Sequence, residues 1–196
     1  MENLKPTIVL ASQSPRRKEL LEKNGVQFQV FVTDADETVS ENMSPNELVK
    51  ELSFRKAKSA AEHFGEEQMI VIGADTVVAL NGEIFGKPTD EMDAFRMLSL
   101  LQGNTHSVYT GYTLAFLDEK GVRYVSDACE TKVRFRSMSD EEIREYIGTN
   151  EPFDKAGSYA IQGIGSKVVE KISGSFDNVV GLPVDEILRT IEQESH

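Results

Sequence analysis

Two arginines stand where the sequence predicts the start of a helix, and their position indicates anion binding. Ser14 is a favoured residue just before a helix and Pro15 suits its first position, so Arg16 and Arg17 fall in the first turn. Cations at this end of a helix oppose its dipole unless an anion lies between them. A hydroxyl-rich turn followed by arginine is typical of a phosphate-binding site, although a solvent-exposed basic turn explains the pattern equally well.

A carboxylate interrupts the most apolar run of the chain. Asp75 lies within Met69–Leu80, which we predict to be a central strand. A buried carboxylate is costly unless it is ion-paired, hydrogen-bonded or bound to a metal. Gly73 indicates a bulge or the close approach of another backbone. We therefore predict a functional site at Asp75, with a purely structural buried aspartate as the alternative.

Further charged residues lie near the predicted ends of helices and strands. Lys56 lies on or beside the apolar face of a predicted helix, either as a lysine whose ammonium reaches solvent or as a cation directed into a cleft. Lys87 and Lys155 are cations near a predicted strand end and in a glycine-rich segment. Glu37 follows a predicted strand in an acidic stretch, where a metal ligand or a solvated loop would fit. Cations together with metal-binding carboxylates are typical of sites that attack a polyphosphate.

Other catalytic chemistries have no signature in this sequence. The three histidines, His63, His106 and His196, lack the spacing of metal ligands. The glycine-rich patterns of dinucleotide-binding folds and of P-loops are both absent. Cys129 lies in an alternating strand pattern, which favours a structural role over a nucleophilic one.

Composition narrows the class of protein. The net charge of −12 argues against a nucleic-acid partner bound by general neutralisation of phosphates, but it allows a small anionic ligand. A single cysteine rules out an internal disulfide framework and fits a reducing compartment. The sequence has no signal peptide and no apolar run approaching about 18 residues. We therefore predict a cytoplasmic protein with no membrane partner.

Capping residues, turn signals and hydrophobic periodicity divide the chain into alternating elements. Strands are expected at residues 8–10, 26–32, 69–80, 83–85, 106–117, 122–135 and 167–172. Helices are expected from Ser14 to Gly25, from a capping box at Ser44, from Thr89 to Gly103, from a second capping box at Ser139 to Gly148, and from Pro183 onward. Asn81-Gly82 predicts a tight hairpin turn. Strands and helices alternate before a long hairpin, an order that favours an α/β fold with a mixed sheet.

Five motifs carry a family resemblance, in chain order LASQSPRR, VIGADTVV, GKP, EPFDKAGSYAIQG and VVGLP. With these motifs the chain resembles the Maf-like nucleoside triphosphate pyrophosphatases. The resemblance implies one Maf-like domain over residues 1–196, with an elongated mixed β-sheet flanked by helices, two lobes and a central cleft. It also implies a fold related to the inosine triphosphate pyrophosphatases. The implied reaction hydrolyses a nucleoside triphosphate to the monophosphate and pyrophosphate with a divalent metal, Mg²⁺ or Mn²⁺.

The resemblance also implies roles for individual residues. The family's active-site positions correspond here to Ser12, Arg16, Glu37, Lys56, Asp75 and Lys87. Asp75 matches the proton acceptor, and we expect Glu37 to hold the metal together with it. We expect Lys56 and Lys87 to assist catalysis. Ser12, Arg16 and Lys155 are expected to bind the substrate.

The family divides according to the base of its substrate. Arg16, Thr76 and Gln162 look like the branch that acts on dTTP and UTP, whereas the branch that acts on 7-methyl-GTP has other residue types there. The Gln162 amide offers both a donor and an acceptor, which match the edge of uracil or thymine. Thr76 directly follows Asp75, so a regular strand would point its side chain to the opposite face. Its role therefore rests on the resemblance.

Two functions are consistent with these residues. The first is the pyrophosphatase. The alternative is a nucleotide-sensing regulatory protein of cell division or septum formation that binds without turnover. The presence of Asp75, Glu37, Lys56 and Lys87 favours catalysis, because binding alone does not need a buried carboxylate. The resemblance also makes a homodimer plausible.

Overall fold

The structure is a computed structural model that describes residues 6–39, 43–64 and 68–194. His196, which the sequence analysis considered as a metal ligand, lies outside the described residues. The strands are β1 (Thr7–Ala11), β2 (Phe28–Val30), β3 (Met69–Leu80), β4 (Glu83–Phe85), β5 (Thr105–Asp118), β6 (Gly121–Phe135) and β7 (Val169–Ser173). The α-helices are α1 (Pro15–Lys23), α2 (Pro45–Phe64), α3 (Glu91–Leu101), α4 (Asp140–Ile147), α5 (Phe176–Val180) and α6 (Val184–Glu194). Short 3₁₀ helices are η1 (Glu151–Asp154), η2 (Ala156–Ser158) and η3 (Gly163–Val168).

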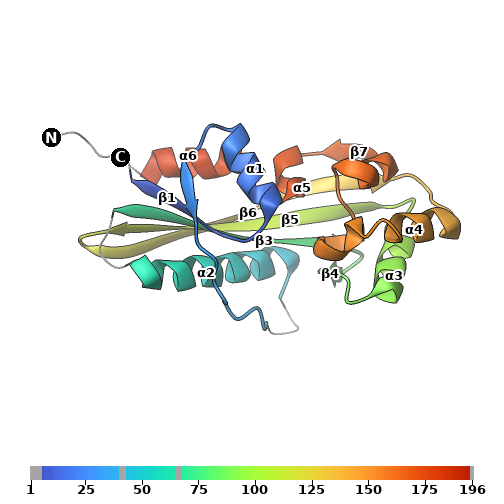
Figure 1. The fold of residues 1–196 in the computed structure, drawn as a ribbon, viewed down its shortest axis with the longest axis horizontal. Helices are drawn as coiled ribbons and strands as arrows, with labels where there is room; N and C mark the ends of the chain where they lie inside the picture. The colour runs from blue at the N-terminus through green and yellow to red at the C-terminus, as the bar shows by residue number, and fades with distance from the viewer. Residues whose placement is uncertain (1–5, 40–42, 65–67, 195–196) are drawn as a thin grey trace. The chain divides into compact units, whose positions relative to one another are not determined.

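The strands form one mixed sheet (Figure 1). Their order is β2-β1-β3-β5-β6-β7, and β4 pairs with β3. β1 runs parallel to β2 and β3, whereas the β3–β4 and β6–β7 pairs are antiparallel. This topology confirms the predicted α/β class with a mixed sheet and flanking helices. No helix in the described part of the chain combines the length and the apolar character needed to span a membrane.

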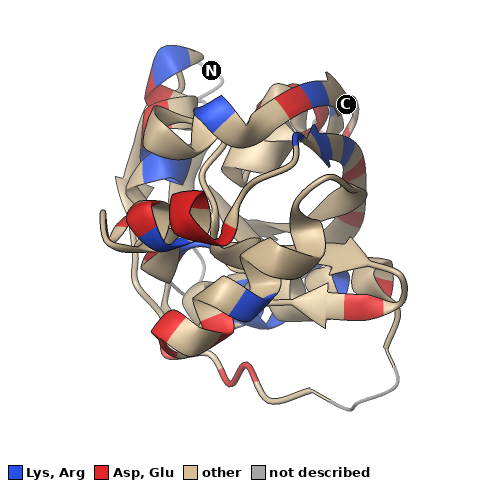
Figure 2. Ribbon diagram, turned by 90° about the vertical axis from the view of Figure 1, so that its right-hand side faces the viewer, with Lys and Arg blue, Asp and Glu red and all other residues tan. Residues whose placement is uncertain are grey.

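The chain divides into two compact units, each described by itself below. Unit 1 contains residues 1–75, 110–129 and 181–196, and unit 2 contains residues 76–109 and 130–180. β3, β5 and β6 each contribute residues to both units. In unit 1, α1 and α6 lie over one face of the sheet and α2 over the other (Figure 1). Acidic and basic segments are interspersed along the helices that face the viewer in Figure 2. The single domain over residues 1–196 stays a prediction.

Helix α2 packs against the sheet of unit 1 at unusually short range. A Cβ added at Gly73 on β3 would lie 2.3 Å from the Ser53 carbonyl oxygen and 2.6 Å from the Ala57 nitrogen. A Cβ at Gly111 on β5 would lie 2.3 Å from the Val49 carbonyl. The predicted close approach of another backbone at Gly73 is therefore confirmed. This contact fixes the residues of α2 next to the part of β3 around Gly73.

Small apolar residues fill the contact between α2 and the strands. The apolar cluster of unit 1 is fully or almost fully buried and consists of Val9, Ala11, Ala57, Ala60, Ala61, Met69, Val71, Ala115 and Leu117. A hydrogen bond of 2.9 Å between the hydroxyls of Ser53 and Thr113 lies at the same interface. Alanine at successive turns of α2 removes the bulk that would hold the helix farther from the sheet.

The local signals for turns and caps were mostly correct. Asn81 and Gly82 both have positive φ, 52° and 85°, as a type I′ turn requires. The Ser44 N–H donates to the Glu47 carboxylate at 2.9 Å and the Glu47 N–H donates to the Ser44 hydroxyl, which completes the first capping box. The second is complete at Ser139 and Glu142. These signals succeed because each depends on residues only a few positions apart.

Several boundaries differ from the prediction. The Ser14 side chain does not cap α1, because the turn is held instead by the Ser14 N–H, which donates to Ser12 Oγ at 3.2 Å. Asp90 rather than Thr89 caps α3, since its carboxylate accepts the Asp93 N–H. Residues 26–32 form only the three-residue β2. Residues 163–168 are a 3₁₀ helix, so the last strand begins at 169, and α5 was not predicted.

A buried histidine lies in the core of unit 2. His106 is 2% exposed, and its Nε2 lies 2.8 Å from the Tyr159 hydroxyl. Its ring meets the rings of Phe135 and Tyr159 edge to face. Burial lowers the pKa of His106 from 6.5 to about 4. The imidazole is therefore neutral in the folded protein at neutral pH.

The packing of α2 predicts a large effect of a single methyl group. Gly73→Ala should lower the free energy of unfolding by about 1–3 kcal/mol or more, because backbone atoms of α2 must move to accommodate the new Cβ. Denaturant unfolding measures this change. Gly86→Ala is the matched control, because a Cβ there meets nothing within 4 Å. Equal stability of the two variants would show that α2 moves away at no cost.

The neutral His106 predicts a pH dependence of stability. Between about pH 6.5 and 4 the unfolded chain binds a proton at His106 that the folded protein does not bind. The free energy of unfolding should therefore decrease as the pH is lowered through this window, by up to about 1.4 kcal/mol per pH unit from this group. Unfolding curves of wild type and His106→Gln at several pH values isolate the contribution. Parallel pH dependences of the two proteins would contradict it.

Candidate active site

The turn after β1 is held by a half-buried arginine of unit 1. Arg17 donates from Nη1 to Ser12 Oγ at 3.2 Å and to the Ala74 carbonyl at 2.9 Å, and from Nε to the Gly181 carbonyl at 2.7 Å. It therefore joins the end of β1, the middle of β3 and the residues before α6. The register of the parallel pair supports this arrangement, since Ala11 pairs with Gly73 and Ser12 follows it.

Arg17 was singled out with Arg16 as a candidate for anion binding, but the sequence did not reveal that it holds this turn through three hydrogen bonds. Burial lowers the pKa of the Arg17 guanidinium, the negative charge of Asp75 offsets this, and neighbouring Arg16 lowers the pKa further. An arginine remains protonated despite such shifts. The pair Arg16–Arg17 carried a usable signal, because consecutive helical residues point about 100° apart. One of them can face the fold while the other faces a ligand, and Arg16 is half-buried at this turn.

An ammonium group and two carboxylates meet beside this turn. Lys56 Nζ on α2 lies 2.6 Å from Asp75 Oδ1 on β3 and 2.9 Å from Glu37 Oε1 in the loop after β2. The side chains of Lys56 and Asp75 are only 16% and 14% exposed, whereas that of Glu37 is 64% exposed. The ammonium therefore points to the two carboxylates and not outward to solvent. The structure brings together three of the charged residues that the sequence singled out in unit 1.

The loop that carries Glu37 is anchored by a second residue of α2. Arg55 donates from Nη1 to the carbonyls of Asp36, at 3.1 Å, and Thr38, at 2.6 Å. The guanidinium thus binds the backbone on both sides of Glu37. A hydrogen bond from the Thr38 N–H to the Asp36 carboxylate, at 2.8 Å, tightens the same loop. Helix α2 therefore positions Glu37 as well as Lys56.

Asp75 and Glu37 have the oxygen donors that a hard divalent cation prefers. Mg²⁺ is commonly bound by one or two carboxylates, with water and substrate phosphate completing its coordination. Among residues 6–39, 43–64 and 68–194, no group of three or more His, Cys, Asp or Glu residues is placed to hold a metal. The two carboxylates near one ammonium therefore fit a cation that shares its coordination with a phosphate ligand.

The remaining predicted residues belong to unit 2. Thr76 is half-buried on β3, and Lys87 is exposed in the turn after β4. Lys155 is 13% exposed, and its ammonium donates to the Glu151 carbonyl at 2.7 Å and to the Asp154 carboxylate at 2.5 Å. Two of its three donors are thus used within its own turn. Gln162 is exposed just before η3. The binding roles of these residues stay predictions.

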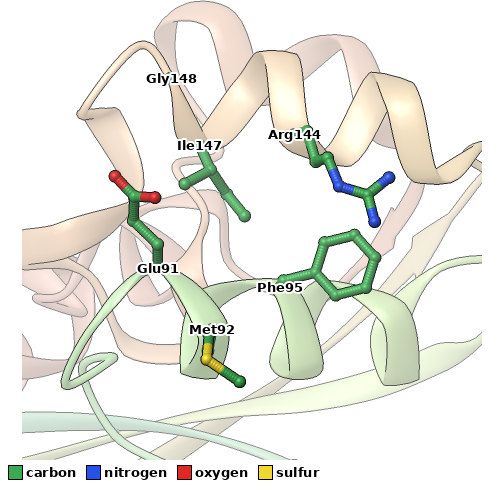
Figure 3. A pocket seen from close by; sticks show the side chains of 6 residues that line it. All are labelled: Glu91, Met92, Phe95, Arg144, Ile147 and Gly148. Carbon is green, nitrogen blue, oxygen red and sulfur yellow. The ribbon is translucent and has the colours of Figure 1, made fainter.

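A pocket in unit 2 contains none of the predicted residues. It lies between α3 and α4 and has a volume of about 420 Å³ (Figure 3). The Arg144 guanidinium lies 4.7 Å from the centre of the Phe95 ring, as a cation–π contact. The lining residues are Glu91, Met92, Phe95, Arg144, Ile147 and Gly148. Charged residues meet at Asp75 in unit 1, so that cluster remains the candidate active site.

Comparison with known proteins places these residues in a family. Residues 7–194 match the family model described as Maf-like protein. A dTTP/UTP pyrophosphatase of Thermoanaerobacter sp. (strain X514) is 50% identical over 187 residues, which are 95% of this chain and 96% of that protein. A dTTP/UTP pyrophosphatase of Bacillus cereus (strain ATCC 10987 / NRS 248) is 45% identical over 192 residues, or 98% of this chain and 91% of that protein.

One solved structure gives a further comparison. The Ham1 protein of Staphylococcus aureus has a TM-score of 0.45 and 16% sequence identity, covering 83% of this chain and 79% of that one. The family match is independent of this structure. It extends from the first residue of β1 to the last residue of α6 and includes all five sequence motifs. The chain therefore belongs to the Maf-like family.

Proposed function

We propose that this protein is a nucleoside triphosphate pyrophosphatase that hydrolyses dTTP and UTP to the monophosphate and pyrophosphate. Relatives with the name dTTP/UTP pyrophosphatase are 45% and 50% identical over nearly the whole chain. The observation that carries the proposal for catalysis is the contact of Lys56 with Asp75 and Glu37, at 2.6 and 2.9 Å. A mostly buried carboxylate beside a cation is a suitable base next to an anionic substrate.

Asp75 acts as the general base. Its carboxylate takes a proton from a water molecule whose oxygen forms a bond to the α-phosphorus. The bond from that phosphorus to the oxygen bridging to the β-phosphate breaks, and pyrophosphate leaves with the electron pair. The ion pair with Lys56 keeps the carboxylate in place, since Lys56 itself is fixed by the packing of α2. As general base, Asp75 accepts one proton from this water and makes no other bond to the substrate.

The hydroxyl and cations of unit 1 bind the phosphates. Ser12 Oγ already accepts hydrogen bonds from Arg17 and from the Ser14 N–H, so its own proton is available to a phosphate oxygen. Lys56 and Arg16 offset negative charge as the bond breaks. A divalent cation, Mg²⁺ or Mn²⁺, would be held by Asp75 and Glu37 and would supply further charge neutralisation at the phosphate oxygens.

Residues of unit 2 have assigned roles in the same proposal. Lys87 assists catalysis by offsetting negative charge on the departing pyrophosphate. Lys155 binds the polyphosphate with the one donor left after its bonds to Glu151 and Asp154. Gln162 reads the base, because its amide offers a donor and an acceptor to uracil or thymine. Thr76 contributes to base selection. The cytoplasmic location and the homodimer stay predictions.

Removal of the proposed base should slow turnover. Asp75→Asn keeps the shape of the side chain and should reduce kcat with dTTP or UTP by about 10²–10⁴-fold, the usual contribution of general-base catalysis. Pyrophosphate release in the presence of magnesium measures it. Asp127→Asn is the control, because Asp127 is an exposed residue of unit 1 in a surface ion pair with Lys50. Near wild-type turnover by Asp75→Asn would refute the assignment, and recovery at high magnesium would mark Asp75 as chiefly a metal ligand.

The role proposed for Gln162 in reading the nucleobase predicts an order of substrates. In a screen of nucleoside triphosphates, dTTP and UTP should be hydrolysed faster than CTP, ATP, GTP and 7-methyl-GTP. Gln162→Glu should cut kcat/KM for the two preferred substrates, since a mismatched hydrogen bond costs about 1–3 kcal/mol. A purine triphosphate in first place would overturn the specificity but leave the pyrophosphatase standing. Tight nucleotide binding without any released pyrophosphate would favour the sensing protein.

A further inference from the structure

The segment that carries Gln162 is anchored from both sides by two residues of unit 2. Glu151 in η1 accepts the Ile164 N–H on Oε1 at 3.0 Å and the Gly165 N–H on Oε2 at 2.8 Å. Tyr146 at the end of α4 accepts the Ala160 N–H on its hydroxyl at 3.1 Å. The anchored backbone groups thus lie two residues before Gln162 and two and three residues after it.

The two anchors are joined to each other. The Tyr146 hydroxyl donates to the Glu151 carboxylate. Burial raises the pKa of Tyr146, so its hydroxyl keeps the proton for this bond. Burial also raises the pKa of Glu151, but hydrogen bonds from Tyr146, Ile164 and Gly165 outweigh it and lower the pKa below its ordinary value. Glu151 is therefore a carboxylate that accepts hydrogen bonds on both oxygens.

Glycines on the far side of Gln162 allow the close approach of these anchors. A Cβ at Gly163, which has a φ of 68°, would lie 2.4 Å from Glu151 Oε1. A Cβ at Gly165 would lie 2.4 Å from the Tyr146 hydroxyl. Both glycines are needed for the carboxylate and the phenol to reach the backbone. The approach of Glu151 and Tyr146 thus explains why both Gly163 and Gly165, in the sequence Gln-Gly-Ile-Gly, are glycines.

The side chain of Gln162 has no such support of its own. Gln162 is exposed, and in the described part of the chain no hydrogen bond is found for its amide group. Its direction is therefore set by the backbone of residues 160–165. A side chain that must present a donor and an acceptor at fixed places needs that backbone to be rigid.

We propose that Glu151 and Tyr146 are positioning residues that fix the orientation of Gln162 and thereby set the discrimination between bases, an inference that rests on the proposed function. Neither residue needs to touch the nucleotide. The Glu151 carboxylate and Tyr146 hydroxyl act through backbone N–H groups, so their effect concerns which base is accepted and not the attack on phosphorus.

Glu151→Gln tests this role with little change of shape. An amide has a single acceptor oxygen, so one of the two backbone N–H groups of residues 164 and 165 then faces an NH₂ group. The ratio of kcat/KM for UTP to that for CTP should fall about tenfold, chiefly through KM for UTP. Glu145→Gln, on the exposed side of α4, is the control and should keep the wild-type ratio. Tyr146→Phe should lower the ratio in the same direction and serves if Glu151→Gln does not fold.

A second background separates positioning from general stability. In Gln162→Ala, the further change Glu151→Gln should alter the UTP to CTP ratio by less than about twofold, because the side chain being oriented is gone. A Glu151→Gln protein that loses melting temperature but keeps the wild-type ratio overturns the inference and leaves the proposed function standing. A wild type that releases no pyrophosphate from any nucleotide overturns the proposed function and this inference with it.

Discussion

Helix α2 lies so close to the sheet of unit 1 that any side chain at residues 73 or 111 would overlap its backbone. This steric constraint determines where the charged residues of α2 stand. Lys56 immediately precedes Ala57, whose nitrogen faces Gly73 on β3, and Asp75 follows two residues later on the same strand. Arg55 lies one residue earlier and binds the loop that holds Glu37. The packing of two backbones therefore brings three charged groups to one place.

The electrostatics of the site follow from this packing. A carboxylate that is 14% exposed loses much of its hydration, and an ammonium at 2.6 Å offsets that loss. Arg17 adds a half-buried positive charge that also binds the Ala74 carbonyl next to Asp75. Two cations from different elements thus stabilise the negative charge of Asp75 before any ligand binds.

The sequence predicted elements whose signals are local. β3 was expected at Met69–Leu80 and has those bounds, because an apolar run with turn residues behind it defines a central strand. The α2 and α4 capping boxes and the turn at Asn81 were correct for the same reason. A functional role of Asp75 was predicted from the cost of burying a carboxylate in an apolar strand, and the structure shows this carboxylate in an ion pair with Lys56. These predictions depend on interactions between residues a few positions apart or on the free-energy cost of burying a charged group.

The features that the sequence did not predict depend on contacts between distant segments of the chain. Arg17 is recognised only when the carbonyls of Ala74 and Gly181 are placed around it. Glu151 serves residues 13 and 14 positions away in the chain through their backbone N–H groups, which no side-chain pattern reveals. The anchors of the segment that carries Gln162 contact it through the backbone of residues 160, 164 and 165. Residue 162 can therefore be exchanged in evolution while the loop keeps its shape, so a change at the position proposed to read the base does not require a change of fold.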